Sequence, residues 1–321
     1  MTYAYHILSR NEHHRASSLD IDINDEFKAL LYAELMGESL QKSLDNATLA
    51  KLQCFASDHA QNIFVLRNVP LSFGLLETPS TEDIAFSHIS RNVLFTLGLF
   101  SIIGKQGFAY EQENNARLVR HVTPKHGSLL KGTSHGSYHL GWHSEHPVFS
   151  IPGTEEVSRN DSPYAPEIIA LTGVYNYEDI PTLIIETKAL LDKAQAEHGS
   201  WLINALQKNH YDVPPGASLS NVEVRRSCPL LSISNEGHFK LRYSDAIVGT
   251  SDQARKALSA LRQTLREEED KLKIVVNLQH CDLLLFKNNT TLHKRSDFDA
   301  NFATGMSRWL MRIFASNPKL I

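Results

Sequence analysis

Short strand-like runs recur from residue 62 onward and restrict the fold more than any other feature of the chain. Each run is rich in β-branched or aromatic residues and is bounded by Pro, Gly, Asn or Asp, as β-strands commonly are. Clear examples are NIFVLRNVP, PEIIALTGVYN, DLLLFKN and SRWLMRIFAS. Many short strands in one part of a chain indicate a sandwich or barrel core.

Helical periodicity is confined to fewer segments. Apolar residues at three- and four-residue spacings predict helices over 26–44 and 47–60, and two further helices are predicted over 182–207 and 253–273. Thr250 and Gln253 are spaced as a capping box for the last of these. Because no repeat, low-complexity tract or long linker interrupts the chain, we predict one domain over 1–321. Residues 1–62 would be mainly helical, and 63–321 would form a mainly β core backed by the helical insertions.

The composition is that of an ordinary globular protein, with 321 residues, 42% hydrophobic and 21% charged. A net charge of −4 and a pI near 6.5 offer no basic field for nucleic acid or an anionic membrane. The three cysteines are too scattered for a disulfide framework, and no apolar run has the length of a membrane span. We therefore expect a reduced, cytoplasmic protein whose partner is a small molecule.

The stretch LGWHSEHPVF places His143 and Glu145 two positions apart in an apolar, aromatic run. In an extended strand, side chains at i and i+2 leave the same face about 7 Å apart, so both would point the same way. An imidazole and a carboxylate, completed by a distant second histidine, form the facial triad that holds non-heme Fe(II). Zinc can use the same ligands.

The same His-x-Asp/Glu spacing occurs twice more, at His210/Asp212 and His280/Asp282. The first of these pairs precedes the turn-rich VPPG and is interpreted as loop. In the second, Asp282 is interpreted as a turn residue that opens a strand. Neither context favours a rigid metal site.

Only the His143/Glu145 pair lies in an apolar strand and has a candidate third ligand, His293, at the end of a later strand. We expect the neighbouring His146 to be an ordinary half-buried histidine that points away from Glu145.

Two arginines follow in SRWLMR. On a strand, Arg308, Leu310 and Arg312 share one face, and a spacing of four would keep both guanidiniums together even on a helix. The planar guanidinium binds a carboxylate bidentately, so this pair suits a dicarboxylate ligand. Because Trp309 and Met311 would occupy the other face, a partly buried site is favoured over a surface strand of ion pairs.

An ordered set of motifs resembles the clavaminate synthase-like Fe(II)/2-oxoglutarate oxygenases, which include hydroxylases of free arginine, asparagine and lysine. The motifs are ETPS (77–80), GFAYEQENNARLVRHVTP (107–124), SHGSYHLGWHSEHPVF (134–149), DLLLFKNNTTLHKR (282–295) and SRWLMR (307–312). The similarity extends from about Phe64 to Phe314. It implies a double-stranded β-helix core, the cupin-like jelly roll, backed by helices.

The resemblance also implies roles for individual residues. The implied iron ligands are His143, Glu145 and His293, and the implied contacts of the cosubstrate 2-oxoglutarate are Arg308 and Thr182.

Two further residues, Arg312 and Ser134, would contact the carboxylate and the amino group of the substrate. The implied reaction consumes O2, decarboxylates 2-oxoglutarate to succinate and CO2, and hydroxylates an unactivated C–H bond. Its substrate would be a free amino acid or a molecule derived from one, in natural-product biosynthesis.

The chain departs from the family pattern at several places. The family has Asp-Asn before the last ligand and His-Gly-Arg at it, where this chain has Lys287-Asn288 and His293-Lys294-Arg295. Where relatives often have Arg-x-Asp for substrate contacts, LRYSDAI offers Ser244, or Asp245 if the acid is shifted by one position. The polar segment 150–165 is longer than the family needs and is a candidate lid.

Three alternatives remain at this level. The same iron centre could desaturate or cyclise its substrate. A zinc hydrolase or isomerase of jelly-roll fold could use the same three ligands. A binding protein could have kept the fold and lost catalysis.

Overall fold

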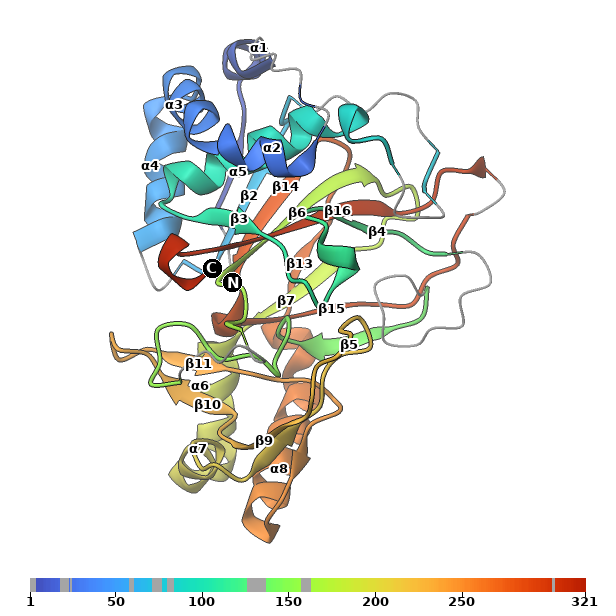
Figure 1. The fold of residues 1–321 in the computed structure, drawn as a ribbon. Helices are drawn as coiled ribbons and strands as arrows, with labels where there is room; N and C mark the ends of the chain where they lie inside the picture. The colour runs from blue at the N-terminus through green and yellow to red at the C-terminus, as the bar shows by residue number, and fades with distance from the viewer. Residues whose placement is uncertain are drawn as a thin grey trace.

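Two β-sheets dominate the part of the chain that the computed structural model describes, which comprises residues 4–17, 23, 25–57, 61–70, 77–79, 84–125, 137–156, 163–301 and 304–321 (Figure 1). The larger sheet is seven-stranded and the smaller four-stranded. The larger has the order β1 (Ala4–Ile7), β2 (Ile63–Arg67), β14 (Leu283–Lys287), β6 (Ile168–Tyr175), β16 (Trp309–Ser316) and β3 (Gln106–Phe108), with β4 (Arg120–Val122) also on β16. The smaller has the order β13 (Ile274–Val276), β7 (Thr182–Glu186), β15 (Thr291–Arg295) and β5 (Leu140–His143).

The central strands of the larger sheet are buried on both faces, and alternate residues of these strands enter different hydrophobic cores. On β14, Leu284 and Phe286 join the core that also contains Ile184 of the smaller sheet. Leu283 and Leu285 join a second core with the N-terminal helices. Because both faces are buried, the LLLF run of this strand is continuously apolar. The first core therefore lies between the sheets.

Helices cover the far face of the larger sheet. They are α1 (Arg10–Ser17), α2 (Glu26–Leu31), α3 (Ala33–Ser43), α4 (Asn46–Ser57) and α5 (Ser90–Ile102). The helix predicted over 26–44 is confirmed, although it is divided at Tyr32. The helix predicted over 47–60 is confirmed as far as Ser57, and residues 58–60 lie outside the described part of the chain. Helix α5 is not predicted from the sequence, because Asn92 to Phe100 are buried on all sides of the helix and no one-sided apolar stripe marks it.

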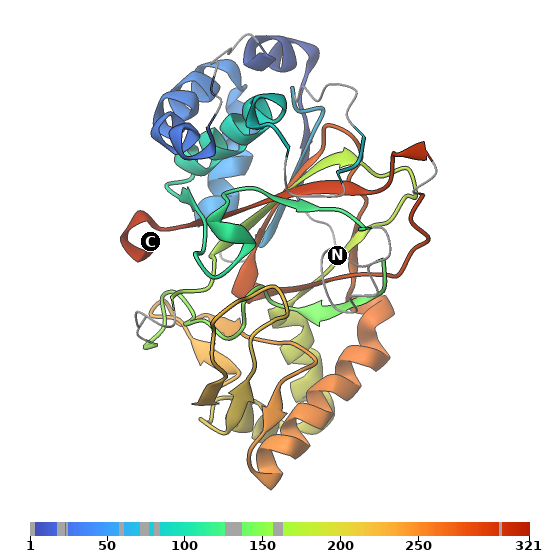
Figure 2. The same cartoon turned by 45° about the vertical axis from the view of Figure 1, so that its right-hand side comes forward.

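A second group of helices lies under the smaller sheet: α6 (Thr187–His198), α7 (Ser200–Leu206) and the long α8 (Asp252–Leu272), which Figure 2 shows from the side. The predicted helix 182–207 is wrong at its start, because Thr182 to Glu186 form strand β7 and the helix begins only at Thr187. The helix predicted over 253–273 is confirmed. Its cap is Ser251, whose side chain accepts the Ala254 N–H, and not Thr250.

Short strands complete the described fold. A three-stranded sheet contains β12 (Val248–Gly249), β8 (Tyr211–Val213) and β9 (Arg225–Cys228), and β10 (Leu231–Ile233) pairs with β11 (Phe239–Leu241). The interpretation of His210/Asp212 as loop is therefore wrong for Asp212, which lies in β8 and pairs with Arg226.

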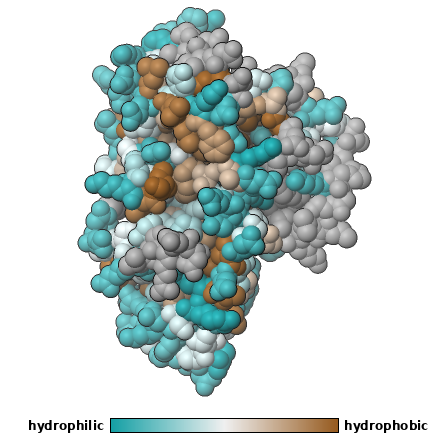
Figure 3. Space-filling model, viewed as in Figure 1, coloured by the Kyte–Doolittle hydropathy of each residue, from teal (hydrophilic) through white to brown (hydrophobic). Residues whose placement is uncertain are grey.

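The surface carries some apolar side chains on the helical side. Phe27, Leu31 and Leu35 of α2 and α3 are all more than half exposed. Apolar surface also gathers in the upper half of the face in Figure 3, where these helices lie. Within the described residues, no helix combines the length and the apolar character that crossing a membrane requires.

Candidate functional site

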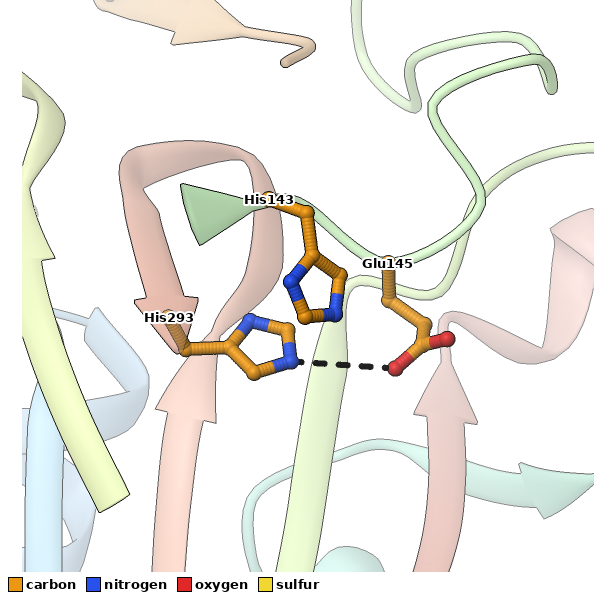
Figure 4. A group of neighbouring side chains, drawn as sticks. All are labelled: His143, Glu145 and His293. Atoms are coloured by element: carbon orange, nitrogen blue, oxygen red, sulfur yellow. Dashed lines mark ion pairs between the residues drawn. The ribbon is translucent and has the colours of Figure 1, made fainter. Parts of the chain in front are cut away.

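The smaller sheet brings two distant histidines together. Strands β5 and β15 are antiparallel neighbours, and His143 is directly opposite His293 in their register. The two rings are 4.1 Å apart between centroids. Figure 4 shows these rings and the Glu145 carboxylate turned toward one another.

Glu145 reaches the group from just beyond the strand. Strand β5 ends at His143, so the predicted extended strand does not include Glu145. Its position is fixed instead by Asn288, which accepts the Glu145 N–H at 2.7 Å and donates to the Glu145 carbonyl at 3.0 Å. Asn288 belongs to the altered Lys-Asn motif and is fully buried. This two-bond clamp connects the loop after β5 to the turn before β15.

The donor atoms of the three residues fit a metal ion. One ligand atom from each of His143, Glu145 and His293 lies within 4.8 Å of the others, and His293 Nε2 is 3.8 Å from Glu145 Oε2. His143 Nδ1 lies 2.8 Å from the Gly141 carbonyl. A hydrogen on Nδ1 would then leave the Nε2 lone pair for a metal.

The charge states of these groups also suit a metal. Burial, with the nearby charge of Arg312, lowers the pKa of His293 well below its ordinary value and keeps the ring neutral. Burial alone would raise the pKa of Glu145, but Arg312 and His146 lower it, so the carboxylate is ionised. Two imidazoles and one carboxylate are ligands that both Fe(II) and zinc accept.

A second group of metal-ligating types, Glu113, Glu145 and His146, also meets within 4.8 Å. Here the Arg312 guanidinium already supplies the cation: its Nη2 donates to Glu113 at 2.7 Å and its Nη1 lies 3.0 Å from Glu145 Oε1. Glu113 is 4% exposed. Its role was not predicted from the sequence, because the two glutamates of YEQENNA are in no pattern that marks a ligand or a catalytic group.

His146 belongs to this buried network, and its expected place away from Glu145 is wrong. Its backbone has φ 48°, a left-handed conformation that reverses the chain after Glu145. The His146 ring therefore lies between the two glutamates. Its Nε2 is 3.0 Å from Glu113 Oε2, and its Nδ1 is 3.9 Å from Glu145 Oε1.

Arg308 and Thr182 form the other polar end of the site. Arg308 is 3% exposed, and its Nη2 donates to Thr182 Oγ1 at 3.5 Å. Burial and the nearby charge of Arg295 lower the pKa of Arg308 to about 9. Its Nε has no hydrogen-bond partner among the described residues. A buried guanidinium with unused donors is a receptor for an anion.

These groups share one cavity of about 330 Å³. It is lined by all three candidate metal ligands, by Thr182, Arg308 and Arg312, and by the loop 214–218. Of the residues implied by the resemblance, only Ser134 lies outside the described part of the chain.

The shifted acid of LRYSDAI also lines the cavity, beside Ser244. The Asp245 carboxylate lies against Gly141 so closely that a Cβ at that position would be 2.2 Å from Oδ2. Tyr243 donates to the other carboxylate oxygen at 3.3 Å. Because Asp245 lines the cavity and is also exposed to solvent, it lies at the cavity mouth.

A further departure has a structural explanation. Lys294, where the family that the sequence resembles has glycine, pairs with Glu269 of α8, and Glu269 also accepts the Trp142 indole N–H at 3.0 Å.

The pair His280/Asp282 is structural, as predicted. Asp282 pairs with Arg67 and accepts the Gln279 N–H, so it stabilises the turn before β14.

The described ends of the candidate lid are firmly attached. Glu156 pairs with Arg242, which is fully buried, and with Arg225 at 3.0 Å. Residues 157–162 lie outside the described part of the chain, so the predicted lid stays a prediction.

Comparison with solved structures identifies the fold. No family model and no curated protein matches the sequence. Among solved structures, asparagine oxygenase in complex with Fe(II), 2S,3S-3-hydroxyasparagine and succinate superposes with a TM-score of 0.76 at 18% identity, over 98% of this chain and 93% of that one. The non-heme iron oxygenase OrfP with Fe and α-ketoglutaric acid gives 0.77 at 19%, over 98% and 94%. OrfP with Fe, succinate and (3S)-hydroxy-L-Arg gives 0.77 at 18%, over the same shares. The chain thus has the fold of these non-heme iron oxygenases.

Proposed function

We propose that this protein is an Fe(II)/2-oxoglutarate-dependent oxygenase that hydroxylates a free amino acid or a small molecule derived from one. The observation that carries the proposal is the presence, in one cavity, of a facial triad and of a buried arginine with unused donors. A zinc hydrolase or isomerase would require the facial triad but not the buried arginine. The similar folds of asparagine oxygenase and OrfP support the same reading, and the facing sheets would be the two halves of a double-stranded β-helix.

The triad would hold the metal through His143, Glu145 and His293. Three protein ligands on one face leave the remaining positions of Fe(II) for 2-oxoglutarate and O2. When bound, iron supplies the oxidative chemistry that converts 2-oxoglutarate to succinate and CO2 and inserts oxygen into a C–H bond. The protein contributes binding, orientation and exclusion of water.

Arg308 and Thr182 would bind the carboxylate of 2-oxoglutarate that is remote from the metal. Arg308 offers a planar fork and Thr182 a hydroxyl on the same side of the cavity. A bound carboxylate would also satisfy the buried Nε. The length of the dicarboxylate then sets the distance between this anchor and the metal.

The substrate would enter beside Asp245 and Arg312. Arg312 uses one donor on Glu113 and one on Glu145, and a guanidinium has five N–H donors, so others remain for a substrate carboxylate. The mouth carboxylate, Asp245, would accept hydrogen bonds from a polar or cationic group of the substrate. We keep Ser134 as a candidate contact of the substrate amino group.

A panel of free amino acids and their derivatives tests this function. The purified protein with Fe(II), 2-oxoglutarate and air should yield succinate and a product heavier by one oxygen for one member of the panel. A product lighter by two hydrogens would make the enzyme a desaturase or cyclase. If metal and 2-oxoglutarate bind but neither succinate nor any other product is formed, the proposal is refuted.

A further inference from the structure

Glu113 is held by three donors in the wall behind the candidate metal ligands. Its Oε1 accepts from Arg120 at 2.8 Å and from Arg312 at 2.7 Å, and its Oε2 faces His146 Nε2 at 3.0 Å. An ionised carboxylate can only accept, so His146 carries its hydrogen on Nε2. Both oxygens of Glu113 are therefore used within the protein.

Arg312 connects Glu113 to a candidate metal ligand. While Nη2 donates to Glu113, Nη1 lies 3.0 Å from Glu145 Oε1. The other oxygen, Glu145 Oε2, faces His293 Nε2. One oxygen of Glu145 is thus engaged by Arg312, and the opposite one is left for the metal.

The surroundings hold this connection rigidly. The His146 ring is packed edge-on against Tyr110 and Phe314, with centroids 5.0 and 5.3 Å apart. The Arg312 guanidinium stacks over Phe314 at 4.2 Å. Asn114, Asn115 and Ala116, which follow Glu113, all have positive φ near 55°. Consecutive left-handed residues are unfavourable by about 1 kcal/mol or more each, so the fold tolerates strain directly beside this carboxylate.

We propose that Glu113 is a positioning residue for the metal centre. It fixes the Arg312 guanidinium, which occupies Glu145 Oε1 and so restricts Glu145 to binding the metal through Oε2 alone. A second oxygen on the metal would take a position that a ligand needs. This inference rests on the proposed function, since it requires the triad to bind a metal.

Co(II) titration under exclusion of air tests the inference without turnover, because Co(II) accepts the same ligands and its visible spectrum reports coordination number. The variant is Glu113→Gln, which keeps the shape and removes the charge. The matched control is Glu156→Gln, another glutamate that pairs with two arginines but contacts no metal ligand. Thermal unfolding of each protein reports whether the fold is retained.

We expect Glu113→Gln to bind Co(II) roughly 10-fold or more weakly, as changes to groups that orient metal ligands do, and to alter the Co(II) spectrum. Glu156→Gln should keep the affinity and the spectrum of the original protein. If Glu113→Gln gave the original affinity and spectrum, the inference would be overturned, and a selective rise in substrate KM would instead make Glu113 a substrate contact. Failure of the unaltered protein to bind Co(II) would overturn the proposed function as well.

Glu113→Asp serves if the glutamine variant does not fold. It keeps the charge and shortens the reach by one methylene, so Arg312 must move to remain paired. A changed Co(II) spectrum with cooperative unfolding supports the inference, and an unchanged spectrum contradicts it.

Discussion

His143 and His293 face each other across the antiparallel pair of β5 and β15, with their Cα atoms in register. This single pairing converts two histidines that are distant in the sequence into neighbours on one face. Glu145 joins them from the loop after β5, where Asn288 holds its backbone. The metal site is therefore a consequence of strand register.

His143→Ala and His293→Ala should each abolish Fe(II) and Co(II) binding while the fold is retained. Each change removes one of three ligands, and two remaining protein ligands rarely hold the ion. Equilibrium dialysis with metal analysis measures the loss. His210→Ala is the matched control and should bind metal normally, because His210 belongs to a pair with the same spacing that has no third ligand near it among the described residues. Equal binding by all three variants would disprove the site.

Arg308→Gln should raise the 2-oxoglutarate requirement by roughly 10- to 100-fold, since hydrogen bonds to a charged group contribute about 1.5–3 kcal/mol. Metal affinity should not change, because Arg308 contacts Thr182 and no metal ligand. The check is 2-oxoglutarate-dependent succinate release. Arg226→Gln, at an exposed arginine, controls for loss of charge. If the requirement were unchanged, the carboxylate would have to bind elsewhere, with Arg312 the next candidate.

Gly141→Ala should weaken substrate binding without affecting 2-oxoglutarate. The added methyl would fall 2.2 Å from Asp245 Oδ2, so the carboxylate must leave its place at the cavity mouth. Because the clash is with a movable side chain, the fold should survive. We expect about a tenfold higher substrate KM, measured by product formation, with succinate release in the absence of substrate unaltered. An unchanged KM would remove Asp245 from substrate recognition.

Glu12→Gln should make stability less sensitive to acid. Burial alone would raise the pKa of Glu12, but hydrogen bonds from Asp45 N–H, Thr48 and Ser9 lower it from 4.5 to about 2. A lowered folded-state pKa contributes stability that is present above pH 4.5 and is lost as the pH falls toward 2.

Urea unfolding between pH 7 and pH 3 measures this effect. The glutamine variant should be less stable at pH 7 by on the order of 1–3 kcal/mol, and the difference should shrink toward pH 3. Glu38→Gln, at an exposed position, should match the original protein throughout. A difference that stays constant with pH would contradict the assignment.

Elements whose burial leaves a local pattern were predictable from the sequence. The one-sided apolar stripe of α8 predicts a helix, and the short apolar run of β14 between Asp282 and Asn288 predicts a buried strand. The strand with the two arginines was also predicted: Arg312 lies in β16, Arg308 immediately precedes it, and both line the cavity, as expected for a shared face.

Features that depend on tertiary contacts were not predictable. Helix α5 is apolar on all sides, so its sequence shows no helical period. The segment TLIIE (182–186) has the pattern of a helix start but forms strand β7, because it pairs with β15. His146 could not be assigned, because a left-handed backbone turns it to the face that alternation excludes. The hydrogen bond between Arg312 and Glu113 joins segments that are remote in sequence, so no local sequence pattern predicts it.

Anaerobic addition of Fe(II) and 2-oxoglutarate, followed by visible absorption, tests whether the metal and the cosubstrate bind together in this cavity. If both bind in one cavity, with 2-oxoglutarate anchored by Arg308 and reaching a metal on His143, Glu145 and His293, a weak charge-transfer band should appear. It should require both components and be lost in His293→Ala. Absence of the band at saturating concentrations of both would contradict the account.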